Sequence, residues 1–469
     1  MITPITTEGY KLFLEGQIAL AEVEHNGMCI DTVYLDNKIE ETDKRIRELS
    51  AGLRKDKDCR QVFKAWKKKY GEKTNLGSRE QLGSILFDVL KIEGGSSTGA
   101  AKARWRTDKD ALEDMDLPFV HKFLEVEKLK KANTTYLKGI RREVDSKGFL
   151  HPSFNLNLVA TFRSSSSSPN TQNWPIRDPE MAAIIRPCMK PRHKDRQIGE
   201  KDLSGAEVRT AACYCKDKAL ITYICNKNTD MHRDTAADAF ILKKKQVSKN
   251  IRYVAKNKCV FPMFYGSWYF DCAKNMWISI DRMQLTTEDG IPLKKHLQSK
   301  GITSLGDLNP NTEPVPGTFI HHMKKVEHTF WKVRFKQYDQ WKWDIWNKYC
   351  ETGYIDTLTG FRCSAIMDRK QATNYSIQGS AFHLILWSLI KIQKQMKKYK
   401  MRTKIIGQIH DSLLVDIGKN ELRDFHEISE KVMTQDLLKH WKWICVPIEA
   451  ELEVAAAGKS WHEKHKIEF

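Results

Sequence analysis

The 469-residue sequence has no apolar run of the about 18 residues that a membrane-spanning helix needs. Its start, MITPITTEGYKLFLEGQIALAEVE, also lacks the basic stretch and apolar core of a secretory signal, and it carries acidic side chains instead. Neither membrane insertion nor secretion is therefore predicted. We expect an intracellular protein without a membrane partner.

Cysteines paired at regular spacing are missing as well. The 11 cysteines are odd in number and scattered, which indicates reduced thiols rather than a disulfide framework. Cys213 and Cys215 form an isolated C-x-C without a second pair at zinc spacing. The cluster of His321, His322 and His328 has no convincing fourth ligand. Packing is the favoured interpretation of both groups, and a zinc site is the alternative.

Acidic residues are outnumbered, since 78 Lys and Arg face 59 Asp and Glu and the net charge is +19. Such a surplus attracts polyanions whatever their sequence, so a nucleic acid is the favoured partner. A solubilising surface and an anionic membrane are the alternatives. With 41% hydrophobic and 29% charged residues, the chain is typical of globular proteins and is long enough for two or three lobes.

Helical and mixed segments alternate along the chain. Residues 33–140 are rich in Lys, Glu, Leu and Arg at helical spacing, which predicts a basic helical lobe. From residue 141, shorter apolar runs broken by turns predict a mixed α/β region. Two of its segments are typical of strands that end in carboxylates: RQIGEKDLSGAEV around Asp202 and TKIIGQIHDSLLVDIG around Asp411. The long helical stretch between them, 216–370, indicates a separate lobe.

These two acids are suited to phosphoryl transfer. Two metal ions about 4 Å apart can activate the attacking oxygen and the leaving group of an in-line displacement together. Magnesium prefers oxygen ligands, so such a site needs converging carboxylates. Asp202 and Asp411 can supply them from adjacent strands. Taken alone, each Asp is more often a turn or cap residue, and only the surrounding pattern favours function.

The segment DLSGAEVR at 202–209 resembles the first catalytic motif of the family A (DNA polymerase I type) DNA polymerases, with an Asp at a strand-to-helix turn and a Glu five residues on. The resemblance implies that Asp202 and the carbonyl of Leu203 are metal ligands. It also implies that Glu207 blocks the sugar 2′-hydroxyl and so favours deoxynucleotides. A fixed side chain under the ribose can reject one hydroxyl by clash and by leaving a polar group unpaired.

The segment QIHDSLL resembles the third motif of the same family. By this resemblance Asp411 is the second metal ligand and His410 steadies the primer end. The chain departs from the family at Ser412, where many relatives have Glu, so the motif does not assure a third carboxylate. Two Asp with the triphosphate and waters still suffice for the chemistry.

Between the two motifs, NIRYVAKNKCVFPMFYG is similar to the helix that closes over the incoming nucleotide. The resemblance implies that Arg252 and Lys256 meet the phosphates and that Phe261 and Tyr265 sit by the base and template. Without the resemblance, the segment would be a basic amphipathic helix with a packed aromatic face.

The closing segment has one residue more than this register allows. Phe261 and Tyr265 are four residues apart, about one helical turn, whereas Lys256 is not a multiple of four residues away from them. A π-bulge near Pro262 would absorb the extra residue. Lys258 in the phosphate role is the alternative, and Lys256 is preferred.

Further segments match the family in its order. TFRSSSSSPNTQNWP and NYSIQGSAF resemble minor-groove contacts, which test pairing geometry and not sequence. TDMHRDTA resembles the stretch whose His approaches the triphosphate. The resemblance implies that the DNA contacts are Arg163, Gln172, Asn173, Asn374 and Gln378, with Arg362 added from GYIDTLTGFR. It also implies that His232 contacts the triphosphate.

Thumb-like sequence begins close to residue 1. NLGSREQLGSILFDVL and KANTTYL resemble the thumb of the family, and we expect no proofreading exonuclease in this chain. The loop between these segments carries Lys102, Arg104 and Arg106, which either order on a phosphate backbone or lie idle at the surface.

The prediction is an α+β, multidomain right-hand polymerase fold with an antiparallel-sheet palm, a helical thumb and helical fingers. The expected parts are palm at 1–32, thumb at 33–140, palm at 141–215, fingers at 216–370 with an insertion at 267–327, and palm at 371–469. The insertion is interpreted as a surface elaboration, with a partner- or DNA-binding element as the alternative.

The expected activity is template-directed addition of deoxynucleotides to a primer 3′ end. We expect two Mg²⁺ ions, with Mn²⁺ as a substitute, together with primer-template DNA and deoxynucleoside triphosphates as partners. A monomer is expected, served by a separate exonuclease or processivity factor. The alternatives are a single-subunit RNA polymerase and a non-catalytic primer-template-binding protein. A phage or other viral setting, in a prokaryotic cytoplasm, is favoured over a specialised repair role.

Overall fold

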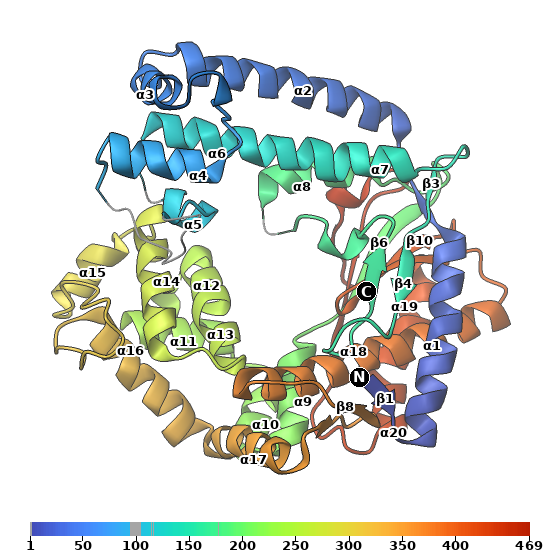
Figure 1. Ribbon diagram of the computed structural model, residues 1–469. Coiled ribbons are helices and arrows are strands. Elements are labelled where there is room, and N and C mark those ends of the chain that lie inside the picture. Colours follow the sequence, from blue (N-terminus) through green and yellow to red (C-terminus); the bar gives the residue numbers. More distant parts are fainter. Residues whose placement is uncertain (1, 94–104, 114, 116, 177) are drawn as a thin grey trace.

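The computed structural model describes residues 2–93, 105–113, 115, 117–176 and 178–469. Over this part of the chain, helices surround a five-stranded antiparallel sheet and three smaller antiparallel sheets (Figure 1). The expected α+β class is confirmed. Among the described helices, none combines the length and the apolar character required to cross a bilayer.

The five-stranded sheet has the order β12-β11-β6-β10-β9. Its strands are β6 (Gln197–Leu203), β9 (Lys404–Ile409), β10 (Ser412–Ile417), β11 (Ala450–Val454) and β12 (His465–Lys466). Every residue of β10 is buried, because helices cover one face of the sheet while the chain around η10 (Trp461–Glu463) and α8 (Pro179–Ile185) packs on the other. This burial explains the apolar run at 413–415 within SLLVDI.

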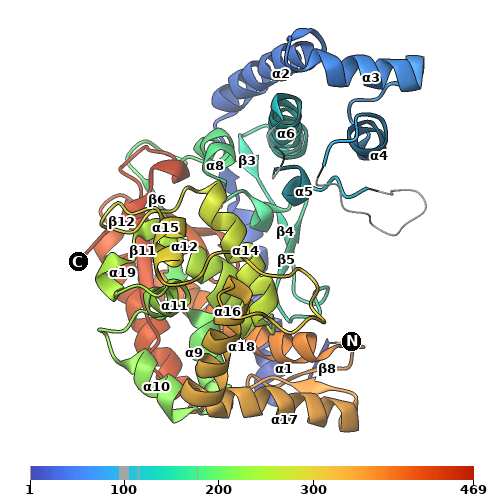
Figure 2. The same cartoon turned by 90° about the vertical axis from the view of Figure 1, so that its left-hand side faces the viewer.

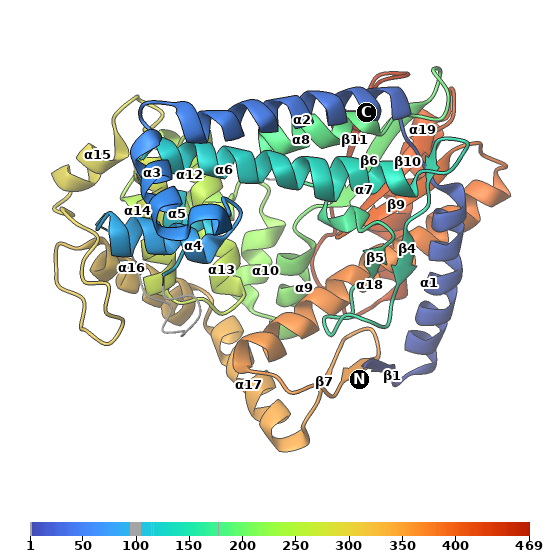
Figure 3. The same cartoon turned by 45° about the horizontal axis from the view of Figure 1, so that its top comes forward.

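Two helices from opposite ends of the chain support this sheet. α1 (Thr7–Asn26) packs on both β9 and α18 (Arg369–Lys398), and Figure 3 shows it running beside the strands. α18 begins at a capping box in which Asp368 and Gln371 satisfy each other's backbone N–H groups. Its middle is buried on all sides, as its long apolar segment requires. The N-terminal residues and the C-terminal third of the chain therefore build one sheet lobe.

The first helical lobe has a hydrophobic core of its own, around Trp66, Phe119 and Phe123. It stands apart above the sheet lobe in Figure 2. The helical spacing of apolar residues between 33 and 140 explains why this lobe forms a hydrophobic core of its own. Its helices are α2 (Thr32–Lys55), α3 (Arg60–Tyr70), α4 (Arg79–Gly83), α5 (Lys109–Glu113), α6 (Pro118–Lys130) and α7 (Lys138–Glu143), with π-helical turns at Ser84–Val89 and Lys131–Leu137. Lys102 and Arg104 lie outside the described residues, and Arg106 pairs with Asp108 at 2.9 Å.

The second helical lobe shares the hydrophobic core of the sheet lobe. α9 (Ala206–Cys215) leads into it, and a cluster of aromatic rings that includes Phe264, Trp331 and Tyr338 fills its base. Its further helices are α10 (Lys218–Cys225), α11 (Met231–Phe240), α12 (Lys249–Ala255), α13 (Phe261–Phe264), α14 (Tyr269–Arg282), α15 (Leu293–Ser299), α16 (Phe319–His328) and α17 (Lys336–Thr352).

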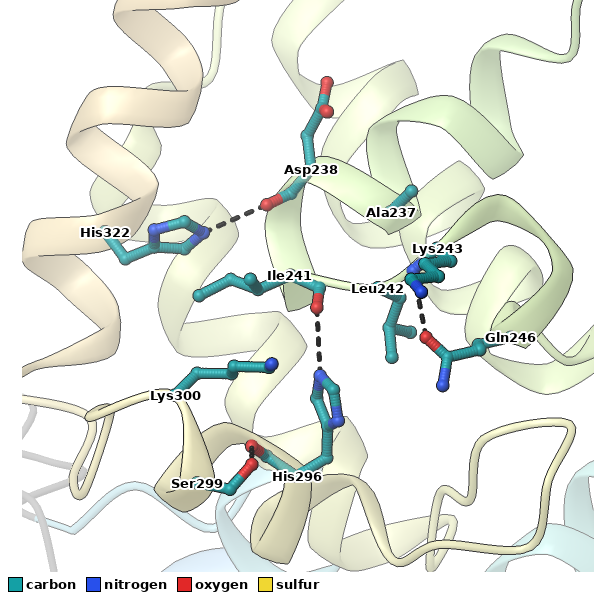
Figure 4. A pocket seen from close by; sticks show the side chains of 10 residues that line it. All are labelled: Ala237, Asp238, Ile241, Leu242, Lys243, Gln246, His296, Ser299, Lys300 and His322. Atoms are coloured by element: carbon teal, nitrogen blue, oxygen red, sulfur yellow. Dashed lines mark hydrogen bonds between the residues drawn. The ribbon is translucent and has the colours of Figure 1, made fainter.

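Segment 267–327 packs against the end of α11 (Figure 4). His296 of α15 places Nε2 3.0 Å from the carbonyl oxygen of Ile241, and His322 of α16 places Nε2 3.0 Å from that of Asp238. The last carbonyls of a helix have no partner within it, so both imidazoles satisfy the C-terminal end of α11. A hollow with Lys243 and Lys300 on its walls lies between these elements.

The three smaller sheets link distant segments. They pair β1 (Ile2–Pro4) and β7 (Ile355–Asp356) with β8 (Phe361–Cys363), β2 (Met28–Cys29) with β3 (Phe149–Leu150), and β4 (Ser153–Asn155) with β5 (Ser165–Ser167). The remaining helices of the sheet lobe are α19 (Leu422–Glu430) and α20 (Leu437–His440).

Candidate active site

The β9–β10 hairpin carries one of the two predicted acids at its tip. Ile409 pairs with Ser412, so His410 and Asp411 form a two-residue loop, and His410 takes the positive φ of 53° that such a loop requires. Asp202 pairs with Ser412 across β6 and β10, and the N–H of Leu203 donates to the carbonyl of Asp411 at 3.1 Å. The structure thus brings Asp202 and Asp411 to the same edge of the sheet.

The acids at this edge repel one another. Burial, followed by the charges of Asp411 and Glu200, raises the pKa of Asp202 to about 8. Burial also raises the pKa of Asp411, against the opposing charges of Arg163 and His410. A pair of half-buried carboxylates whose ionised forms are disfavoured needs a cation to become fully charged.

The predicted donor set, two carboxylates and the Leu203 carbonyl, suits a hard divalent cation, and the structure places the Leu203 backbone next to Asp411. In the part of the chain that the structure describes, no group of three or more His, Cys, Asp or Glu side chains is placed to hold a metal ion. A cation here would depend on two acids, and water or substrate oxygens would complete its coordination.

Ser412, where a third acid was in question, contacts a carboxylate that the sequence motifs did not single out. Its hydroxyl donates to Oε1 of Glu200 over 3.0 Å and also lies 3.0 Å from the Ile409 carbonyl. Oε2 of Glu200 accepts from Trp461 Nε1 at 2.9 Å and lies 2.8 Å from Lys464 Nζ. The one available signal was spacing, because Glu200 and Asp202 alternate onto the same face of β6.

Glu207 and Arg163, predicted for sugar selection and DNA contact, form an ion pair. Glu207 lies in the first turn of α9, which Gly205 enters with a positive φ of 62°. Burial raises the pKa of Glu207, Arg163 opposes that rise and Asp411 adds to it. The pair therefore lies close to Asp411, one of the two predicted acids.

A cationic group lies on the helical segment around α12 and on α11. Arg252 places Nε 2.7 Å from Oδ2 of Asp230, the residue that caps α11. Burial, and then the charges of Arg252 and Lys256, lower the pKa of His232 to about 4. His232 is therefore a neutral imidazole between two cations at pH 7.

The predicted bulge is confirmed, because residues Lys256–Val260 form a π-helical turn between α12 and α13. The turn absorbs the extra residue and brings Lys256 Nζ 5.5 Å from the centroid of the Phe261 ring. His232 and Tyr265 also pack against this ring, at centroid distances of 5.5 and 6.4 Å. Lys258 is exposed. Lys256 thus shares one face with the other predicted nucleotide contacts.

Gln172 is placed differently from the expected surface contact with DNA. Its amide is only 8% exposed, and Nε2 donates to Ser164 Oγ at 2.7 Å and to Gln408 Oε1 at 2.8 Å. Gln408 in turn donates to the carbonyl of His410 at 2.5 Å. Gln172 therefore supports the hairpin tip from inside. The neighbouring Asn173 is exposed.

The remaining predicted DNA contacts are divided between two places. Asn374 of α18 donates to the carbonyl of Tyr265 at 3.3 Å, and its Oδ1 is buried without a hydrogen-bond partner among the described residues. Gln378 lies about one turn further along α18 and is half-buried. Arg362 is not brought to this group, because it lies on β8 in another sheet and binds Asp356 through two nitrogens, at 2.7 and 2.9 Å.

A model of the family described as DNA polymerase family A matches residues 44–289 and 322–463. DNA polymerase I of Bacillus subtilis (strain 168) is 27% identical over 458 residues, which are 95% of this chain and 44% of that protein. The DNA polymerase of Bacillus phage SP01 is 24% identical over 498 residues, 94% of this chain and 50% of that protein. The chain thus spans about half the length of the curated relatives it matches.

Among solved structures, the polymerase domain of Pol1 from M. smegmatis, in complex with DNA primer-template and dNTP, is similar with a TM-score of 0.73. It is 24% identical, and the likeness covers 96% of this chain and 70% of that one. The expected polymerase-domain fold is therefore confirmed. Residues 290–321, inside the segment predicted as an insertion, fall outside the family match.

Proposed function

This chain belongs to DNA polymerase family A, and we propose that it is a template-directed DNA polymerase that adds deoxynucleotides to a primer 3′ end. The observation that carries the proposal is the placement of Asp202, on β6, and Asp411, in the loop of the β9–β10 hairpin, at one sheet edge. The first helical lobe is then the thumb, the sheet lobe the palm and the second helical lobe the fingers. Primer-template DNA and deoxynucleoside triphosphates are the proposed partners.

The proposed chemistry is in-line phosphoryl transfer. Divalent cations held by Asp202, Asp411 and the Leu203 carbonyl would supply Lewis-acid charge to the attacking and leaving oxygens. Mg²⁺ fits this oxygen donor set, and Mn²⁺ can replace it. Burial of the two acids keeps their charge poorly screened, which strengthens their pull on a cation.

The cationic face would serve the triphosphate. Arg252 and Lys256 can offset the negative charge that develops on the leaving pyrophosphate. His232 adds a neutral imidazole beside them that can donate or accept a hydrogen bond. Phe261 and Tyr265 present ring surfaces for the base.

Discrimination against ribonucleotides is assigned to Glu207. Its carboxylate is held in place by Arg163, so a 2′-hydroxyl that met it could not displace it at low cost. The exposed Asn173 and the half-buried Gln378 remain the proposed minor-groove contacts.

Primer extension by the purified protein tests this function. With a labelled primer-template, Mg²⁺ and deoxynucleotides, we expect template-dependent extension, and with ribonucleotides little or none. DNA binding is measured in parallel by fluorescence anisotropy. Preference for ribonucleotides would instead identify an RNA polymerase. Binding without any extension would identify a non-catalytic primer-template-binding protein and would refute the proposal.

A further inference from the structure

The third acid that many relatives have at position 412 is replaced here by Ser412, yet a carboxylate lies within one hydrogen bond of that position. Glu200 approaches from β6, and the Ser412 hydroxyl lies 3.0 Å from its Oε1. Ser412 is itself directly opposite Asp202. Asp202 and Ser412 thus share one rung of the sheet, and the serine reaches Glu200 on the next rung of the same face, where Glu200 lies opposite Leu414.

The position of Glu200 is rigid. Trp461 Nε1 and Lys464 Nζ hold its second oxygen at 2.9 and 2.8 Å, and its side chain is only 13% exposed. Because same-face residues on a strand are about 7 Å apart, its carboxylate stands close behind that of Asp202. The side chain cannot swing into solvent without breaking three contacts.

The charge of Glu200 is only partly neutralised by its neighbours. Lys464 also binds Glu453, the residue opposite Glu200 on β11. Two carboxylates share this ammonium, and the buried Arg186 is a further cation near them, so the Glu200 carboxylate keeps only part of its negative charge next to the rung of Asp202. In a buried position that charge is weakly screened, so it adds to the attraction for a cation.

We propose that Glu200 is a positioning residue that supplies, from β6 and through Ser412, the negative charge that many relatives place at position 412 on β10. The acid thus lies on β6, on the next rung of the same face from the hydroxyl on β10. Glu200 contributes its charge and fixes Ser412, and coordination is left to the two Asp side chains and the Leu203 carbonyl. The inference rests on the proposed function, since it assumes a divalent-cation site at Asp202 and Asp411.

Direct cation binding tests the proposal independently of activity. Free Mn²⁺ is measured by electron paramagnetic resonance with the full chain, with and without a deoxynucleoside triphosphate. We expect Glu200→Gln to raise the Kd for Mn²⁺ about 10-fold or more, the usual effect of removing an outer-shell partner. The reciprocal double variant, Glu200→Ser with Ser412→Glu, restores the charge on the other strand, so its Kd should return to within about threefold of the unmodified protein.

Glu453→Gln is the matched control. It removes the other partner of Lys464, but β6 lies between its strand and that of Ser412, so we expect a change in Kd of less than about threefold. An equal effect of both variants would show that only the general charge of the sheet matters, and it would overturn the proposal. A Glu200→Gln protein with an unchanged Kd and an unchanged melting temperature in the absence of metal would also overturn it.

Asp202→Asn distinguishes a failure of this inference from a failure of the proposed function. If Asp202→Asn abolishes Mn²⁺ binding while Glu200→Gln has no effect, the inference fails and the proposed function stands. If Asp202→Asn leaves binding unchanged, the cation site itself is wrong. Should Glu200→Gln fail to fold, recovery of both folding and the Mn²⁺ Kd in the reciprocal double variant would still support the proposal, and a folded double variant with a weakened Kd would refute it.

Discussion

The edge of the five-stranded sheet and the cationic face of the second helical lobe carry charges of opposite sign, and neither charge is fully balanced by its neighbours. At the sheet edge, burial and neighbouring acids raise the pKa values of Asp202 and Asp411. On the fingers, burial and neighbouring cations lower the pKa of His232. In each region burial is the largest cause of the pKa shift, and neighbouring like charges add to it. The two regions therefore need ligands of opposite sign. Divalent cations suit the sheet edge, and a triphosphate suits the cationic face.

Outside the two acids Asp202 and Asp411, the largest effect we expect separates the shape of the Glu207 side chain from its charge. Glu207→Ala opens space under the ribose and should lower the preference for deoxynucleotides over ribonucleotides about 100-fold, the scale on which one added hydroxyl is discriminated. Glu207→Gln keeps the shape and removes the charge. Its selectivity should stay near that of the unmodified protein. Competitive single-nucleotide insertion measures both, and a loss in the Gln variant equal to that in the Ala variant would assign the role to charge.

The cationic face is tested by a pair of lysines. Lys256→Met should lower kcat/KM for the incoming nucleotide about 10-fold or more, because one charge-assisted hydrogen bond to phosphate is lost. Lys258→Met removes an exposed lysine two positions away and should leave kcat/KM within about twofold. Steady-state insertion kinetics compare them. The reverse pattern would give the phosphate role to Lys258.

When divalent cations are removed, Asp202 and His232 should change the stability of the protein with pH in opposite directions. The folded pKa of Asp202, about 8, lies above its unfolded value, so the stability it contributes is present at low pH and is lost as pH rises towards 8. Asp202→Asn should therefore melt a few degrees higher than the unmodified protein at pH 8, with a smaller difference at pH 5.

His232 should give the opposite slope. Its folded pKa, about 4, lies below the unfolded value, so its contribution is present above pH 6.5 and is lost as pH falls towards 4. His232→Gln should flatten the stability curve in that window. Melting curves in a chelator between pH 4.5 and 8 measure both slopes. Slopes of the same sign for the two residues would contradict the comparison.

The smallest effect concerns the support of α11, which carries His232 near its beginning. His296→Ala removes the imidazole at the Ile241 carbonyl and should cost on the order of 1 kcal/mol, with faster amide exchange at the end of α11. His328→Ala, at an exposed position of α16, is the control and should change neither. Hydrogen exchange read by mass spectrometry reports the difference. Equal amide exchange in the two variants would show that the contact between His296 and Ile241 does not stabilise the end of α11.

Local sequence rules predicted a large part of this architecture. The helical lobe at 33–140 follows from apolar spacing, and the π-helical turn at Lys256–Val260 follows from one surplus residue in a helical register. Asp202 and Asp411 were identified because each ends a strand-like segment and lies in a motif that resembles the family. All of these signals are contained in short segments.

The unpredicted features depend on pairing between distant segments. The contact of Glu200 with Ser412 requires the register of β6 against β10, and no short segment specifies that register. The burial of Gln172 depends on Gln408, and the C-terminal end of α11 is satisfied by histidines from two other helices. The placement of Arg362 is determined by the strand pairing of β8 with β1 and β7.

The central claim is that Asp202 and Asp411 act together on a shared divalent-cation site. Single-turnover primer extension by Asp202→Asn and Asp411→Asn, on DNA already bound, tests it most directly, with the exposed Asp424→Asn as control. We predict that each active-site variant extends about 1,000-fold more slowly or worse, with DNA affinity within about threefold of the unmodified protein. Extension within about 10-fold of the unmodified rate in either variant would contradict the account.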